Sequence, residues 1–148
     1  MFGSRLAYST GLPAVDARDD FARARRAHLT ARLGRSLRRR RSLRDQPRTL
    51  RDGVRARRVV RASGTRVIPL SRIVGTVEPS PHFDTRFRPA SDHLRPRWER
   101  VALALRKGLA LPPVQVVEGN DGYYLVDGRH RVSVALAAGQ RDIEAWIA

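Results

Sequence analysis

The chain has 148 residues, 41% of them hydrophobic, and a formal net charge of +16. This length allows one domain with an extension, and the absence of cysteine excludes disulfides, thiolate zinc sites and a cysteine nucleophile. No apolar run approaches the ~20 residues of a membrane-spanning helix, and no signal-peptide core follows Met1. We therefore expect a cytoplasmic protein that has no membrane partner.

The positive charge is concentrated in the first part of the chain. Residues 1–66 carry 19 arginines and 5 acidic residues, whereas residues 67–148 have a net charge of only +2. This asymmetry predicts an Arg-rich, partly helical extension over 1–66 and a domain over 67–148. Such an arginine-rich arm could bind DNA or RNA without sequence specificity. A solvated helical arm, or one that docks on a partner protein, fits the same residues.

The extension is predicted to contain two helices after a loose tail up to Val15. The first begins at a cap, Asp16 or Asp19, and runs to about Leu33, where Gly34 weakens or ends it. Its larger apolar residues recur at multiples of four and predict one buried face: Phe21, Leu29, Leu33 and Leu37. The second helix is expected over residues 49–60.

The domain alternates short apolar runs with segments of helical period. Residues 71–74 predict a turn or short helix, and Asn120-Asp121-Gly122 predicts a hairpin. Trp98 and Trp146 are expected to be core anchors. Strands are expected at 67–70, 114–118, 123–126 and 143–147, and helices at 97–107 and 132–138. The order β–α–β–β–α–β predicts an α/β (α+β) fold, a small mixed sheet with packed helices.

One turn concentrates the residues that could bind a ligand. The strand at 123–126 leads into Asp127-Gly128-Arg129-His130-Arg131, and an alanine-rich helix follows. A helix N-terminus attracts anions, and an arginine fork matches two phosphate oxygens. Gly128 would keep a side chain out of the path of the anion. The turn Gly128–Arg131 therefore predicts an anion site, most simply for phosphate.

The same turn resembles the signature of the ParB/sulfiredoxin superfamily, in the form of a short stand-alone bacterial ParB-like N-terminal domain. Residues 68–75 resemble the first strand of these domains, and residues 111–117 resemble the strand that pairs with 123–126. The resemblance covers roughly residues 66–148. It implies a ParB/sulfiredoxin-like fold and a nucleotide ligand such as CTP or ATP with Mg²⁺, in a family that includes chromosome partitioning proteins.

The resemblance also assigns roles to the residues of the turn. Arg131 matches an arginine that contacts nucleotide phosphate; an ion pair with Asp127 or Glu144 is the structural alternative. His130 matches the histidine of the sulfiredoxin turn and could donate to phosphate or move a proton, or simply bond the backbone. Arg129 stands where partition proteins have glutamate and sulfiredoxin has its catalytic cysteine. Because arginine is neither nucleophile nor general base near pH 7, reductase activity is not expected, and binding without turnover is left open.

Two further features concern a metal and a loop. Asp127 could hold Mg²⁺ through water, or could form the turn by bonding its own backbone. Candidates for a second carboxylate are Glu78, Asp84 and Glu99. Residues 83–89 lie where the family has a Pro/Arg-containing loop near the nucleotide, so Arg86 or Arg88 could reach a phosphate. A packed surface loop is the alternative.

Three functions fit these features. The first is a ParB-like domain that binds a nucleotide or other phosphate ligand at Gly128–Arg131, with the basic arm on DNA or RNA. The second is a Mg²⁺-dependent phosphotransferase or nuclease of the same superfamily, which would use Asp127 and His130. The third is a non-catalytic, antitoxin-like module that binds another protein. Because Ala148 ends the sequence soon after this domain, we do not expect the site-specific DNA reading of full partition proteins.

Overall fold

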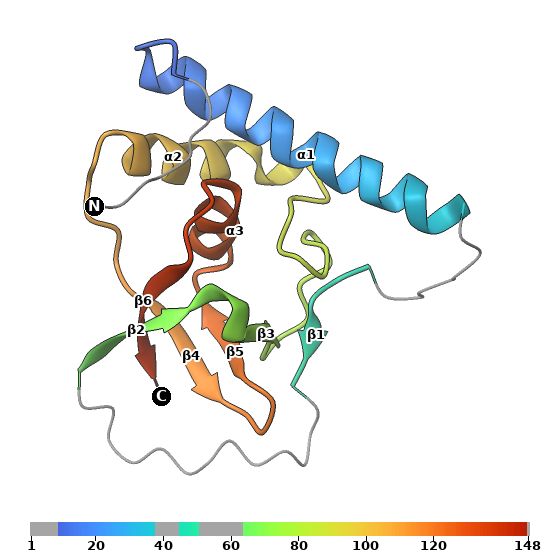
Figure 1. Cartoon of the computed structure of the whole chain (residues 1–148), viewed down its shortest axis with the longest axis vertical. Coiled ribbons are helices and arrows are strands. Elements are labelled where there is room, and N and C mark those ends of the chain that lie inside the picture. Colours follow the sequence, from blue (N-terminus) through green and yellow to red (C-terminus); the bar gives the residue numbers. More distant parts are fainter. Residues whose placement is uncertain (1–8, 38–44, 51–63, 148) are drawn as a thin grey trace.

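The computed structural model of the chain describes residues 9–37, 45–50 and 64–147. Figure 1 shows α1 lying across α2, with α3 between α2 and the sheet. The elements in chain order are α1 (Pro13–Leu37), β1 (Arg48–Thr49), β2 (Thr65–Pro69), η1 (Leu70–Arg72), β3 (Ile73–Thr76), η2 (Asp92–Leu94), α2 (Arg95–Arg106), β4 (Val114–Glu118), β5 (Tyr123–Asp127), α3 (Arg129–Ala137) and β6 (Asp142–Ile147).

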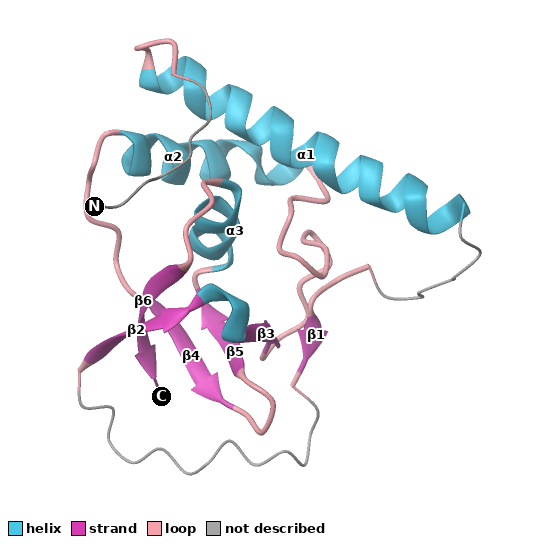
Figure 2. Cartoon of the chain, viewed as in Figure 1, coloured by secondary structure: helices cyan, strands magenta, loops and turns pink. Residues whose placement is uncertain are grey.

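The strands form one mixed sheet in the order β1-β3-β5-β4-β6-β2. The pairs β1–β3, β3–β5 and β4–β6 are parallel, and β4–β5 and β2–β6 are antiparallel. The helices gather on one side of this sheet (Figure 2). A mixed sheet with packed helices was expected and is confirmed. The predicted hairpin is confirmed as well, because Gly119 N–H donates to Gly122 O at 2.8 Å between β4 and β5.

Two strands of the sheet, β1 and β3, were not expected. The prediction of a turn or short helix over residues 71–74 is right for η1 but wrong from Ile73, where β3 begins. Gly75 explains how β3 fits, because a Cβ atom there would lie 2.1 Å from Arg48 O. A glycine is therefore required for the close approach of β1. The second helix predicted over residues 49–60 is wrong at Thr49, which belongs to β1, and its remainder from 51 onward lies outside the described residues.

Two clusters of buried residues hold the layers together. The first lies between the sheet and α3 and includes Val114, Leu125 and Val132. The second joins α1, α2 and α3 around Phe21 and Trp98, whose rings meet edge to face at 5.5 Å. The Trp98 indole also donates to Ser133 Oγ at 2.8 Å, so its polar atom is satisfied in the core. Trp98 is the core anchor that was predicted.

Trp146 is not a core residue. Its side chain is 42% exposed, because β6 turns Ala145 toward the helices and Trp146 toward the opposite face of the sheet. The prediction of a second tryptophan anchor is therefore wrong. The residues of β6 that pack in the core are the alternate ones, Ile143, Ala145 and Ile147.

Helix α1 is longer than predicted and buries a different face. It begins at Pro13, so Asp16 lies in the first turn instead of capping it, and it continues past Gly34. Leu29 and Leu33 are 44% and 66% exposed, which contradicts the predicted apolar face, and the Leu37 side chain lies outside the described residues. The buried stripe combines small, aromatic and polar residues: Asp16, Ala17, Asp20, Phe21, Ala24 and His28.

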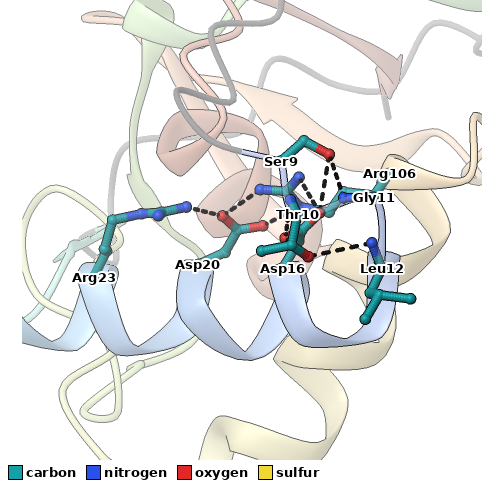
Figure 3. Close-up of polar contacts among 8 residues, drawn as sticks. All are labelled: Ser9, Thr10, Gly11, Leu12, Asp16, Asp20, Arg23 and Arg106. Carbon is teal, nitrogen blue, oxygen red and sulfur yellow. Dashed lines mark hydrogen bonds and ion pairs between the residues drawn. The ribbon is translucent and has the colours of Figure 1, made fainter.

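Ion pairs explain why this polar face of α1 can be buried (Figure 3). Arg106, at the end of α2, donates from Nε and Nη2 to the two oxygens of Asp20 at 2.6 and 2.8 Å. Hydrogen bonds from the N–H and hydroxyl of Thr10 hold the pKa of Asp16 below its usual value.

The extension predicted over residues 1–66 contacts the domain predicted over residues 67–148, because α1 packs on α2 and β1 pairs with β3. The division of the chain at residue 66 stays a prediction.

Among the described helices, none combines the length and the apolar character needed to cross a membrane.

Candidate functional site

The predicted turn joins β5 directly to α3. The helix begins at Arg129, three residues before the predicted start at Val132, so the three basic residues form its first turn. Gly128 makes this possible, because its φ of 109° lies in the left-handed region. A Cβ atom on Gly128 would also lie 2.6 Å from Val114 Cγ1. Backbone conformation and packing against β4 therefore explain this glycine without any anion.

Arg131 braces the turn against the segment before β4. Its Nη1 donates to the carbonyl oxygens of Pro112 and Pro113 at 2.7 and 2.6 Å. Its Nη2 donates to Asp127 Oδ2 at 2.9 Å, which is one of the ion pairs considered from the sequence. With a side-chain exposure of 16%, the guanidinium is largely committed to these partners. The predicted contact of Arg131 with phosphate stays a prediction.

Arg129 and His130, unlike Arg131, each have a buried nitrogen atom without a hydrogen-bond partner among the described residues. Arg129 Nε and His130 Nε2 are both buried, and neither has a hydrogen-bond partner among the residues that the structure describes. Leaving such an atom unpaired costs about 1–3 kcal/mol. The N–H groups of a first helical turn also lack acceptors within the helix, and Gly128 has no side chain to cap them. The N-terminus of α3 thus gathers several nitrogen atoms that lack a partner among the described residues.

The surroundings of His130 keep its ring neutral. Burial, followed by the positive charges of Arg97 and Arg129, lowers the pKa of His130 to about 4. The Phe83 ring meets the imidazole edge to face at 5.4 Å. A bound anion would stabilise the protonated ring and so counter the effects of burial and of the two arginines on the pKa of His130, which would rise. Binding of an anion next to His130 would therefore favour protonation of the ring.

Asp84 organises the loop that carries Phe83. Its side chain has no exposed surface, and its Oδ1 accepts from the N–H groups of Arg86 and Arg88 at 2.9 Å each. Oδ2 accepts from Arg88 Nε at 2.7 Å and lies 3.1 Å from His28 Nδ1. Burial raises the pKa of Asp84, but the hydrogen bonds from Arg88 and His28 outweigh it and hold the pKa below the usual value.

These contacts bear on the prediction that Arg86 or Arg88 could reach a phosphate. The Arg88 guanidinium is bound to Asp84, so the expectation that Arg88 could reach a phosphate is not met in this arrangement. Arg86 is exposed. Sequence reasoning missed His28 altogether, because a single histidine among arginines gives no sign of a partner 56 positions later.

Asp127 belongs to no group of three possible metal ligands in the part of the chain that the structure describes. Among the described residues, the one group of three possible metal ligands is His28, Asp45 and Asp84, whose ligand atoms lie within 4.8 Å of one another. Four donors already surround the Asp84 oxygens, one of them the cationic Arg88, so we interpret this group as a hydrogen-bond network. Of the other two candidates, Glu99 pairs with Arg95 at 3.2 Å, and Glu78 offers its backbone oxygen to Arg129 at 3.5 Å.

Comparison of the chain with protein-family models, with curated proteins and with solved structures finds no match. The resemblance to the ParB/sulfiredoxin superfamily therefore rests on the residues of the turn and stays a prediction.

Proposed function

We propose that the N-terminus of α3 binds the phosphate of a nucleotide or of another phosphate ligand. The observation that carries this proposal is the pair of buried nitrogens, Arg129 Nε and His130 Nε2, that lack partners among the described residues. Both residues lie in the first turn of α3, whose N–H groups also need an acceptor. Phosphate oxygens accept hydrogen bonds from such groups, and the helix dipole favours the negative charge of a phosphate.

Each residue of the turn has a distinct part in this proposal. Arg129 donates to a phosphate oxygen, and His130 takes up a proton and donates as well. Gly128 and Arg131 hold the turn in place. Asp127 is 57% exposed and fits the water-mediated contact to Mg²⁺ that a nucleoside triphosphate such as CTP or ATP would require. This set of residues supports binding and supplies no evident nucleophile.

The experiment is a thermal-shift screen followed by calorimetry. Phosphate, pyrophosphate, CTP, ATP and GTP are added with and without Mg²⁺ to the wild type and to Arg129→Gln and His130→Gln. Arg100→Gln, at an exposed arginine of α2, is the matched control. A ligand at ~100 times its dissociation constant should add about 2.7 kcal/mol to the free energy of unfolding. Binding that is lost in both site variants and kept in the control supports the proposal; binding that none of the variants changes refutes it.

A second candidate function is non-specific binding of DNA or RNA by α1. The buried stripe of α1 packs on α2, while Arg18, Arg26 and Arg32 of the same helix are exposed. Each phosphate contact of this kind releases counterions, so affinity would fall steeply with salt. Replacing the three arginines with glutamine should weaken binding to a mixed-sequence duplex and reduce its salt dependence. An unchanged salt dependence would exclude α1 as the contact surface.

A further inference from the structure

We propose that α1 regulates the phosphate site through Asp84, so that docking of α1 and binding of the ligand strengthen each other. This inference rests on the proposed function of the α3 N-terminus. It adds a positioning role for Asp84 and a regulatory role for His28, neither of which contacts the ligand. The contacts form a continuous path from α1, through the loop at 83–89, to the His130 ring.

The first step of the path joins α1 to the loop. His28 is buried on the inner face of α1, and its Nδ1 lies 3.1 Å from Asp84 Oδ2. Arg25, one turn earlier, donates to Pro89 O at 3.3 Å and pairs with Asp92 at 3.2 Å. In Figure 1 the yellow-green segment that contains this loop runs from β3 to the beginning of α2 beneath α1. Releasing α1 would therefore remove the cover and a hydrogen-bond partner from Asp84.

The second step is the shape of the loop itself. Phe87 has a φ of 58°, and it is the sole non-glycine residue with positive φ in the part of the chain that the structure describes. This conformation is strained for a bulky side chain and persists only where the surroundings impose it. The surroundings here are Asp84 and its partners: Phe87 N–H donates to Asp84 O at 2.9 Å, and Asp84 N–H donates to Arg88 O at 3.0 Å. The loop is thus held by the residue that contacts α1.

The third step reaches the site. Phe83 precedes Asp84 in the chain, is buried, and places its ring against the His130 imidazole. It belongs to the same cluster as Phe21 and Ala24 of α1. If α1 leaves, Phe83 loses packing on one side while the loop loses its tie to His28. The His130 ring would then be less constrained, and the ligand would have to order it on binding, which lowers affinity.

The test uses two substitutions at His28 in the full chain, with pyrophosphate as the probe and calorimetry as the measurement. His28→Leu keeps apolar volume and removes the donor to Asp84, whereas His28→Asn keeps an N–H near the position of Nδ1. We expect His28→Leu to bind at least about fivefold more weakly than the wild type, the lower end of typical couplings, and His28→Asn to bind within about twofold of it. Equal affinity in His28→Leu and wild type would overturn the inference.

A reciprocal measurement on the wild type serves if His28→Leu does not fold. Because coupling is mutual, pyrophosphate should slow tryptic cleavage at the arginines of α1, and it should give no such protection in His130→Gln. Cleavage at the same rate with and without bound pyrophosphate would also overturn the inference. A wild type that binds none of the phosphate ligands of the screen would refute the proposed function itself, so the two failures are distinguishable.

Discussion

Replacing His130 should change how the stability of the protein depends on pH. The unfolded chain takes up a proton on this ring at its usual pKa near 6.5, and the folded chain does so only at about 4. Acidification from pH 7 to pH 5 therefore favours the unfolded chain, because it binds a proton that the folded chain excludes. The neutral ring contributes to the free energy of unfolding at pH values above its usual pKa, and this contribution is lost as the pH falls toward 4.

The magnitude follows from the two pKa values of His130. A shift of this size makes the folded state about 2 kcal/mol less stable at pH 5 than at pH 7. Because the ring is only half-buried, solvent screens part of this effect, and we expect a loss of about 1–2 kcal/mol. In His130→Gln this loss should be absent, since glutamine does not titrate.

The assay is urea unfolding of the wild type, His130→Gln and a control, His93→Gln, at several pH values between 7 and 5. His93 is an exposed histidine of η2, so its replacement should leave the pH dependence unchanged. An NMR titration of the His130 ring gives its pKa directly. The reasoning is refuted if His130→Gln loses as much stability between pH 7 and pH 5 as the wild type does.

Three further substitutions test the packing that positions the site, each by chemical denaturation. Gly128→Ala should cost about 2–4 kcal/mol, because the new Cβ would be strained at positive φ and would overlap Val114; a cost below 1 kcal/mol would contradict this account. Trp98→Phe should cost about 2 kcal/mol through lost volume and an unpaired Ser133 hydroxyl, and Ser133→Ala alone should cost clearly less. Arg106→Leu should cost about 2–3 kcal/mol, because Asp20 loses its buried cation and keeps only the more exposed Arg23, and the exposed Arg100→Leu should be nearly neutral by comparison.

The parts of the fold that local pattern controls were predictable from the sequence. β4 has the predicted limits, 114–118, because an apolar alternation there is bounded by Pro113 and a Gly-containing hairpin. α2 and the strand before Gly128 follow from the same local signals. Likewise the turn at Gly128–Arg131 could be recognised as a concentration of donors at a helix start.

The parts that depend on distant partners were not predictable. β3 exists because Gly75 admits β1, which comes from a different part of the chain. The buried face of α1 was hidden because Asp20 and His28 look like surface residues until Arg106 and Asp84 are placed beside them. The ion pair of Arg131 with Asp127 was considered from the sequence, but the bonds of Arg131 to the carbonyl oxygens of Pro112 and Pro113 were not.

The order of the strands has a consequence for how the protein is made. β2 pairs with β6, so Thr65 must wait for Trp146, which the ribosome adds 81 residues later. At about 5–20 residues per second, this partner emerges several seconds after β2. α1 faces a shorter but similar delay before α2 appears. Because its inner face carries Asp16, Asp20 and His28, the nascent helix exposes little continuous apolar surface during that time, which reduces its tendency to aggregate.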